Sequence, residues 1–419
     1  MKKRKDVFNQ RETYKLVETL TSGEFDSELD LLMSLIREIV SREDFDIIGG
    51  RVWEIAPKDR AYCLKFQYGD VKSIPDNYKV TIDAHPVLKD LYEKKSTLSR
   101  ESDPVLRDVG ILVYSITGVG RTFKLKGGKY YKYVLGFNAP EIPESFFETL
   151  NIISSVASIA INEHNRRQKQ KEFGRDLVKA AEIQRNLLPE HNYEFHDYKL
   201  YGVCLPDSEI GGDYFDFLRN MDDEEERLGV LISDAASKGL SAAIQALFVS
   251  GAIKMAMEFS PKISTIMTRL NNLIHETFPS ERFVTLVYCE LSLSSNRLVL
   301  YANAGHCEPI HYRPNTDQMK YLESTGGLLG IVKNQKFMVE NINMRPGDVL
   351  VLYTDGINEA QDANRNLYGE DRLKTIIKQN HHLSAKEISY IILEDVQKFS
   401  TDSTYSDDKT LVVIKRDPK

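Results

Sequence analysis

Four aspartates are the residues of this sequence that are best placed to do chemistry. Asp234, in VLISDAASKG, and Asp355, in VLVLYTDG, each end an apolar run that is typical of a buried strand. Asp407, in SDDKTLVVI, precedes such a run, and Asp213 lies in GGDYFDF. If the three strands are neighbours in the fold, several carboxylates meet at one edge of it.

Such a cluster of carboxylates would be strongly repulsive unless cations compensated its charge. Hard divalent cations with all-oxygen, water-rich coordination suit it, which favours Mg²⁺ or Mn²⁺. A single Asp-Gly pair after a strand is usually only a turn. Four aspartates that each have their own flanking signature favour a metal site over four separate turns.

Eight sequence blocks follow one another in an order that resembles a known family. They are AAEIQRNLLPE, GGDYFDF, ISDAASKGLSAA, NAGHCEP, GGLLGI, GDVLVLYTDGINEA, YGEDRL and SDDKT, between residues 180 and 415. In this order they resemble the SpoIIE/RsbU-like phosphatases, a bacterial branch of the metal-dependent (PPM, protein phosphatase 2C-like) serine/threonine phosphatases. The resemblance implies a C-terminal α-β-β-α sandwich that removes phosphate from a protein.

The resemblance also implies a role for each aspartate around two ions, Mn²⁺ or Mg²⁺. Asp234 would bridge the two ions, and the backbone carbonyl of Ala235 would help to hold the second. Asp355 and Asp407 would bind the first ion, and Asp213 would support the second directly or through water. A water activated between two ions is the nucleophile in this chemistry, so no serine or cysteine nucleophile is needed.

Some positions depart from the family pattern. Where the family usually has Asp-x-Ser-Gly-Lys-Gly, this chain has Ala236 and Ser237 before the matching Lys238 and Gly239. The NAGH block continues with Glu308 and a single proline, where two prolines are common, and no phosphate-gripping arginine is evident. None of these changes affects a side chain expected to bind metal.

Two further motifs leave alternatives open. His306, in NAGH, is either a general acid or a turn residue that satisfies backbone groups, and we favour the turn residue. Gly326, Gly327 and Gly330 form either a phosphate-cradling loop or tight packing turns, and we favour the turns.

The elements around these motifs predict an α+β protein. After Pro189, short strand-like runs joined by turns are interrupted by apolar helical stretches, which predicts a layered phosphatase domain over residues 191–419. Residues 25–150 read as a helix, antiparallel strands and the start of another helix. This order and length resemble a GAF domain, which implies a sensor and dimerisation module. Residues 1–24 are expected to be a flexible N-terminal segment.

A long helix is predicted between the two domains, with residues 151–190 as a helical linker. Its middle, NEHNRRQKQKE, is polar on every face, as in helices that bridge domains or pair with a partner. Phe173, Leu177, Ala180 and Leu187 then follow with heptad-like spacing. We therefore expect a homodimer.

Composition excludes several classes of protein. A net charge of −7 and a pI near 5.8 argue against a nucleic-acid partner. No apolar run reaches the ~18–20 residues of a membrane span, and the basic N-terminus leads into a polar stretch rather than a signal peptide. Four scattered cysteines fit a reducing compartment. These features predict a cytoplasmic protein without a membrane span.

The sequence thus predicts a cytoplasmic signalling phosphatase that is regulated through an N-terminal sensor. By resemblance, its substrate is a phosphorylated regulatory protein, such as an anti-sigma-factor antagonist of the STAS type. Two alternatives are a pseudophosphatase that only binds a partner and a protein whose main function is small-ligand binding by the N-terminal domain. The full set of four aspartates favours the enzyme.

Overall fold

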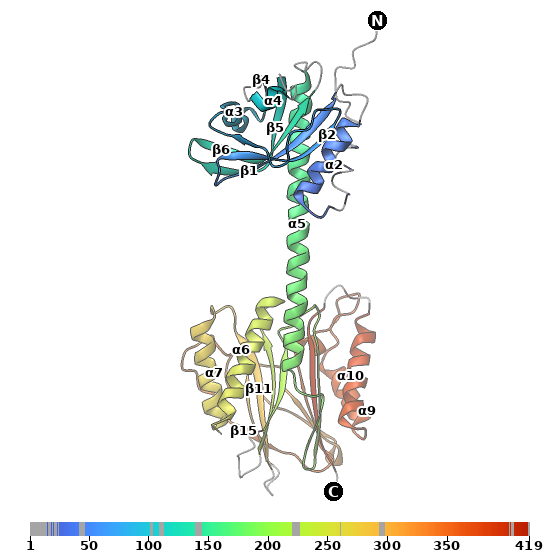
Figure 1. Cartoon of the computed structure of the whole chain (residues 1–419). Coiled ribbons are helices and arrows are strands. Elements are labelled where there is room, and N and C mark those ends of the chain that lie inside the picture. The colour runs from blue at the N-terminus through green and yellow to red at the C-terminus, as the bar shows by residue number, and fades with distance from the viewer. Residues whose placement is uncertain are drawn as a thin grey trace. The chain divides into compact units, whose positions relative to one another are not determined.

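The computed structural model describes most of the chain (Figure 1). The described residues are 15, 18, 20, 23, 25–41, 47–100, 104–108, 113–138, 145–219, 227–259, 261–292, 298–401, 403 and 406–417. They form two compact units, Met1–Phe173 and Gly174–Lys419. The expected N-terminal segment 1–24 lies almost wholly outside the described residues.

The N-terminal unit is built on one antiparallel sheet of six strands in the order β3-β2-β1-β6-β5-β4. The strands are β1 (Gly49–Ala56), β2 (Ala61–Gly69), β3 (Lys79–Thr81), β4 (Ser96–Arg100), β5 (Val113–Leu125) and β6 (Gly128–Asn138), and the helices are α2 (Glu28–Val40), α3 (Val87–Lys94), α4 (Pro104–Asp108) and the first part of α5 (Ser145–Leu187). α2 begins at Ser27, whose side chain accepts a hydrogen bond from the Asp30 amide. This is an α+β unit, and its likeness to a GAF domain stays a prediction.

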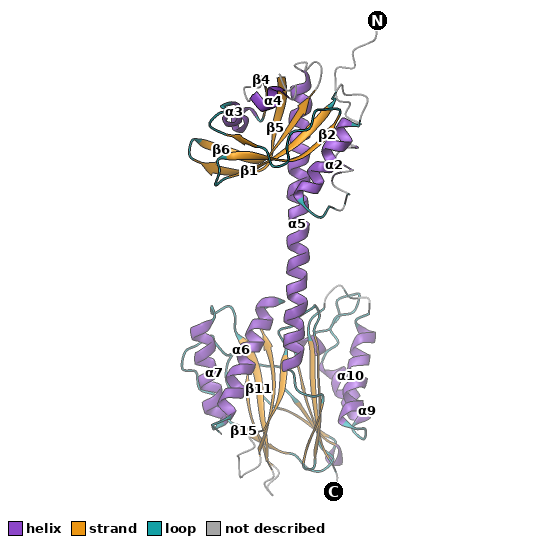
Figure 2. Cartoon of the chain, in the orientation of Figure 1, coloured by secondary structure: helices purple, strands orange, loops and turns teal. Residues whose placement is uncertain are grey.

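The C-terminal unit has two stacked sheets between two layers of helices (Figure 2). The first sheet has the order β15-β12-β11-β10-β9, and the second has the order β14-β13-β16-β17-β8-β7. The first contains β9 (Tyr214–Arg219), β10 (Arg227–Ala235), β11 (Val284–Ser292), β12 (Leu298–Ala304) and β15 (Glu340–Asn343); the second contains β7 (Asn192–Phe195), β8 (Tyr198–Leu205), β13 (Ile310–Arg313), β14 (Gln318–Tyr321), β16 (Val349–Tyr353) and β17 (Lys409–Arg416).

Three hydrophobic cores hold these layers together. Helices α6 (Leu240–Met257) and α7 (Ile263–Thr277) pack on the first sheet, and α9 (Glu370–Asn380) and α10 (Ala385–Phe399) pack on the second. Between the sheets, side chains such as Ile232, Leu352 and Val412 are fully buried. The arrangement is the α-β-β-α sandwich that the sequence predicts for this part of the chain.

The sequence analysis expects no membrane span, but helix α6 meets the length and composition of one. Among the described residues it is the one helix long and apolar enough to cross a membrane, with a mean hydropathy of 1.5. Ser241, Gln245, Ser250 and Lys254 interrupt its apolar sequence. Its buried face, with Ala246, Val249 and Ile253, is part of the core against the first sheet.

Candidate metal centre and active site

The register of the two sheets brings the predicted aspartates to one edge of the sandwich. In the first sheet Ser233 pairs with Tyr214, so Asp234 and Asp213 adjoin the same pair of residues. In the second sheet Tyr353 pairs with Leu411, which places Asp355 just after β16 and Asp407 just before β17. Each sheet therefore contributes two of the four carboxylates.

Hydrogen bonds and charge interactions connect the two pairs. The Thr354 hydroxyl, next to Asp355, donates to Asp213 Oδ2 at 2.7 Å. The Asp234 carboxylate interacts electrostatically with Asp355 and Asp407, across the space between the sheets. We call Asp213, Asp234, Asp355, Asp407 and the adjacent Asp408 the carboxylate edge.

The carboxylate edge is partly buried, with Asp213 buried and the other four aspartates half-buried, and it carries more negative charge than its neighbours compensate. Burial and then the charges of Asp355 and Asp407 raise the pKa of Asp234 to about 7. Burial and the charge of Asp234 raise the pKa of Asp213 well above its ordinary value, and burial and Asp407 raise that of Asp355. Raised carboxyl pKa values from burial and like charges are typical of functional sites.

The glycines beside the aspartates allow the close approach of backbone segments. A Cβ at Gly356 would lie 1.9 Å from the Asp408 carbonyl oxygen, so only glycine fits where α8 (Asp355–Asn358) meets the start of β17. A Cβ at Gly211 would lie 2.5 Å from Asp408 Oδ2, and one at Gly212 would lie 2.8 Å from the Ala242 side chain. Close packing therefore requires glycine in the Asp-Gly and Gly-Gly-Asp sequences, in addition to any role of these glycines in turns.

Asp408 is a residue of this edge that the sequence analysis did not single out. Its carboxylate accepts hydrogen bonds from the amides of Asp207, at 2.8 Å, and Gly212, at 2.6 Å. It thereby ties the loop that carries Asp213 to the start of β17. The signal was present in the SDDKT block, where two adjacent acids precede a strand.

The chemistry of the carboxylate edge fits hard divalent cations, although its side chains are not arranged around one. No group of three or more Asp, Glu, His or Cys side chains among the described residues is positioned to hold a metal ion. Asp407 Oδ2 instead forms an ion pair of 2.9 Å with Lys238, and Asp408 is bonded to backbone amides. The clustered carboxylates, among them Asp213, Asp234 and Asp355 with raised pKa values, nevertheless offer the oxygen donors and the negative charge that such cations need.

The remaining predicted positions lie at or near this edge. Ala235 is buried at the end of β10, and its carbonyl accepts a 2.6 Å hydrogen bond from the Ser237 amide. His306 is 6% exposed and lies 2.8 Å from the Thr285 hydroxyl through Nδ1. Burial lowers the pKa of His306 to about 4, so its ring is neutral at physiological pH. This favours the structural role over that of a general acid.

The glycine-rich stretch 326–330 packs against apolar side chains. A Cβ at Gly326 would lie 2.4 Å from the Phe337 ring, and one at Gly330 would lie 2.5 Å from the Ile274 side chain. Gly330 also has a φ of +93°, a conformation that favours glycine. These contacts support the packing turns that the sequence analysis favours.

A solved structure identifies the fold of this unit. The fold is similar to the SiaA-PP2C domain of Pseudomonas aeruginosa, with a TM-score of 0.51 and 18% identity, over 59% of this chain and 99% of that one. The C-terminal unit thus has the fold of the protein phosphatase 2C class.

The sequence comparisons narrow this class. The family described as Stage II sporulation protein E (SpoIIE) matches residues 224–417. The phosphoserine phosphatase RsbU of Bacillus subtilis is 28% identical over 286 residues, 66% of this chain and 82% of RsbU. Protein IcfG of Synechocystis is 28% identical over 270 residues, 58% of this chain but only 41% of IcfG. Residues 224–417 thus match the SpoIIE family, and these likenesses support a SpoIIE/RsbU-like serine/threonine protein phosphatase.

Proposed function

We propose that this protein is a Mn²⁺- or Mg²⁺-dependent phosphatase of bacterial signalling. Its substrate would be phosphoserine or phosphothreonine on a small regulatory protein, such as an anti-sigma-factor antagonist of the STAS type. It would act as a cytoplasmic homodimer that is regulated through its N-terminal unit. The main support is the convergence of Asp213, Asp234, Asp355 and Asp407, from two sheets, at one partly buried edge.

The resemblance to the family suggests which of these groups would hold the ions. Asp234 would bridge two ions, Asp355 and Asp407 would hold the first, and Asp213 and the Ala235 carbonyl would hold the second. Bound ions would supply charge neutralisation and a water of lowered pKa for attack on phosphorus. The raised pKa values of these aspartates support the proposal, because cations would relieve the repulsion that raises them.

The surrounding residues would keep these ligands in place. Thr354 orients the Asp213 carboxylate, and Asp408 anchors the loop before Asp213. Lys238 pairs with Asp407 and has an exposed side chain, 64% accessible. It would balance part of the negative charge and face the phosphorylated substrate as a cation. In this chain, Lys238 could therefore contribute to phosphate binding in the absence of an evident arginine.

The C-terminal part of α5 supports the proposed regulation. Gln184 Nε2 donates to the Gly211 carbonyl at 2.8 Å, and its Oε1 accepts from the Gly211 amide at 3.3 Å. Ala181 of α5 packs with Ile210 and Ala243 in a small buried cluster. Because Gly211 is two residues from Asp213, a shift of this part of α5 would move a proposed metal ligand.

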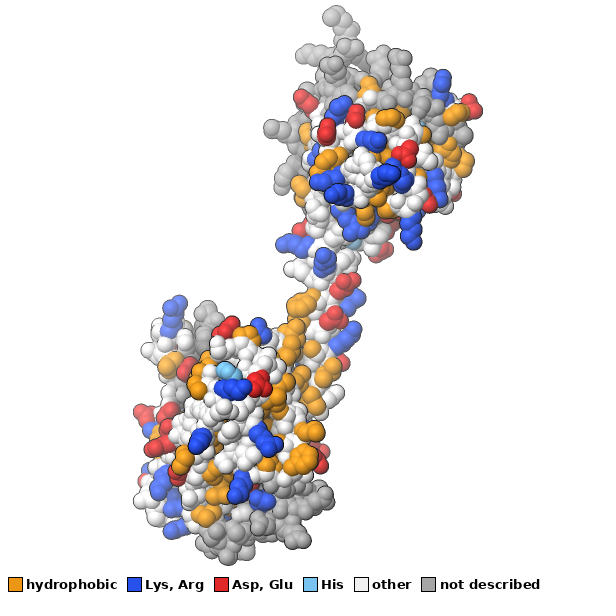
Figure 3. Space-filling view, turned by 90° about the vertical axis from the view of Figure 1, so that its left-hand side faces the viewer, with side chains coloured by type: hydrophobic (Ala, Val, Ile, Leu, Met, Phe, Trp, Pro, Cys, Tyr) orange, Lys and Arg blue, Asp and Glu red, His pale blue; other side chains and the backbone are white. Residues whose placement is uncertain are grey.

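The same helix supports the proposed homodimer. Hydrophobic side chains lie exposed along α5 (Figure 3). Phe173 is 56% exposed, and Ile183 is 58% exposed. The sequence analysis also placed Leu177 and Ala180 in this stripe, but both pack against the buried cluster within the C-terminal unit. Among the exposed hydrophobic residues of α5, those from Phe173 onward are available to a second copy: Phe173, Val178, Ile183 and Leu187.

Dephosphorylation of a phosphoserine protein by the full chain tests the proposed function. We expect phosphate release with Mn²⁺ or Mg²⁺, and its loss with a chelator or in Asp234→Asn and Asp355→Asn. Asp371→Asn is a matched control, because Asp371 is an exposed acid on α9 with a side chain 96% accessible. Equal activity with and without divalent cations would contradict the proposal.

A further inference from the structure

The two faces of the N-terminal sheet have different surroundings. Successive strand residues point to opposite faces, and Val52 and Leu135 accordingly join a core with α2 and α5. Trp53 and Val134, their neighbours in sequence, join a second core that includes Leu91 of α3 and Leu106 of α4. This second core is not completely filled.

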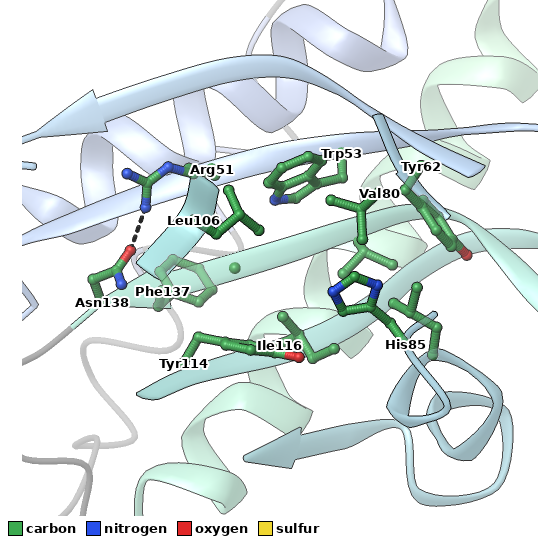
Figure 4. A pocket seen from close by; sticks show the side chains of 13 residues that line it. Arg51, Trp53, Tyr62, Val80, His85, Leu106, Tyr114, Ile116, Phe137 and Asn138 are labelled. Atoms are coloured by element: carbon green, nitrogen blue, oxygen red, sulfur yellow. Dashed lines mark hydrogen bonds between the residues drawn. The ribbon is translucent and has the colours of Figure 1, made fainter. Parts of the chain in front are cut away.

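A cavity lies in this second core (Figure 4). About 60 Å³ of it is open to the centre of a water molecule. Since one water needs roughly 10–15 Å³ by this measure, the space would hold about four waters or one small organic molecule. Its walls are mainly apolar and aromatic, from residues that include Trp53, Tyr62, Val80, Leu106 and Ile116.

One end of the cavity carries a buried positive charge. Arg51 is only 3% exposed; it donates from Nη1 to Asn138 Oδ1 at 2.5 Å and from Nη2 to the Lys72 carbonyl at 3.0 Å. Its Nε has no hydrogen-bond partner, and no carboxylate among the described residues pairs with its guanidinium. Burial lowers the pKa of Arg51 only to about 10, so it stays charged at neutral pH.

An uncompensated guanidinium costs folding free energy, because a buried charge is stable only when it is paired. Neutral acceptors from Asn138 and Lys72 use two of the five donors of the side chain. A structural role would be served as well by a neutral residue. An anion bound in the cavity would pair with the Arg51 guanidinium and would account for a positive charge at this position.

A glycine keeps the neighbouring part of the cavity open. A Cβ at Gly136 would lie 3.7 Å from both Trp53 Nε1 and Ile116 Cγ2, at ordinary contact distance. Because Gly136 lines the cavity, a larger side chain there would extend into the space beside Trp53 and Ile116. The open space and the charge thus lie next to each other on the same sheet face.

We propose that this cavity binds a small organic carboxylate of about four to six heavy atoms. The carboxylate would accept from Arg51 Nε and an Nη group, since a guanidinium binds carboxylates through two parallel hydrogen bonds. A short alkyl tail would lie against Trp53 and Ile116. Inorganic phosphate fits less well, because it has no apolar part to lie against the mainly apolar and aromatic walls.

Binding of propionate to the full-length protein tests this proposal, with propionamide as the neutral isostere. Calorimetry measures the affinity of the protein for each ligand, and saturation-transfer NMR shows whether the ligand contacts the protein. We expect propionate to bind and propionamide to bind at least ten-fold more weakly. Arg51→Gln should lose this preference without a lower melting temperature, because it removes a buried charge. Lys124→Gln, which removes an exposed charge from the same unit, should bind as wild type.

A second variant keeps the test decisive if Arg51→Gln does not fold. Gly136→Val fills the cavity while leaving Arg51 in place, and it should abolish propionate binding. Equal binding of propionate and propionamide would show an apolar cavity only and overturn the proposal. So would absence of binding by acetate, propionate and butyrate at millimolar concentration, or propionate binding that Gly136→Val leaves unchanged.

Discussion

Asp408 shows how one acid can organise others through backbone groups. Both of its carboxylate oxygens accept from backbone amides, of Asp207 and Gly212. Its neighbour Asp407 points one oxygen at Lys238 instead. Two adjacent aspartates therefore have different tasks, one in fixing the loop before Asp213 and one at the proposed metal centre.

At the same scale, Gly356→Ala should reduce activity strongly. Its Cβ would overlap the Asp408 carbonyl oxygen, which belongs to backbone and cannot rotate away. Displacement of Asp355 or Asp407 by about 1 Å is expected to cost on the order of 100-fold in kcat/KM. Gly251→Ala is the control, because nothing lies within 4 Å of its Cβ on helix α6. Wild-type kinetics in Gly356→Ala would contradict this role.

Asp348 offers a prediction about stability and pH. It is fully buried, with His311 Nε2 at 2.9 Å and Arg313 Nε at 3.2 Å. Burial alone would raise its pKa, but the hydrogen bonds from His311 and the Arg345 amide outweigh this and lower it. Removing one partner of such a buried pair costs about 3 kcal/mol, so Asp348→Asn should unfold at a lower temperature at pH 7.

The sign of the pH dependence follows from the lowered pKa. A carboxyl whose folded pKa is depressed adds stability above its unfolded pKa, near 3.8, and loses it as the pH falls through the folded value. The difference in melting temperature between wild type and Asp348→Asn should be constant from pH 7 to about 5 and shrink below about 4. A difference that grows on acidification would contradict this assignment.

At the scale of elements, the end of α5 is expected to control the loop before Asp213. Gln184→Ala removes two hydrogen bonds to Gly211, so the loop loses its attachment to the helix. We expect at least a ten-fold lower kcat at unchanged melting temperature, with partial rescue by higher Mn²⁺ concentration. Glu182→Ala, at an exposed position on the same helix, should behave as wild type. Equal kcat values for Gln184→Ala and Glu182→Ala would contradict the proposed coupling between α5 and the loop before Asp213.

The sequence could predict the elements that bear the aspartates, because apolar runs that end in an acid have a distinctive pattern. It could not separate the two sides of α5. Leu177 and Ala180 share heptad-like spacing with Phe173 and Leu187, yet the first two pack inside the C-terminal unit. Spacing shows that a face is apolar but not which surface covers it. The roles of Asp408 and Gln184 could not be predicted either. Both side chains bond to backbone groups, and the pattern of side chains in a sequence gives no sign of such bonds.

At the scale of the whole molecule, two copies are expected to pair along α5. Ile183→Glu places a charge among exposed apolar residues of this helix. It should shift the full chain from dimer to monomer in light scattering, while Arg175→Glu, at an exposed polar position, should not. A wild-type chain that is monomeric at micromolar concentration would contradict the dimer.

Transmission through the helix has its own test. Two residues inserted near Arg166 would turn one end of α5 by ~200° relative to the other. If α5 carries a signal, the insertion should change phosphatase activity or its dependence on Mn²⁺. An insertion variant that stays dimeric and has wild-type kinetics would show that α5 only tethers the units.

Calorimetric titration of Mn²⁺ into the full chain tests most directly whether the carboxylate edge is the catalytic metal centre. We predict two bound ions per wild-type chain, at least ten-fold weaker binding in Asp234→Asn, and parallel loss of phosphoserine hydrolysis. Asp371→Asn should match wild type in both measurements. An Asp234→Asn protein that binds Mn²⁺ and hydrolyses phosphoserine as the wild type does would contradict the assignment.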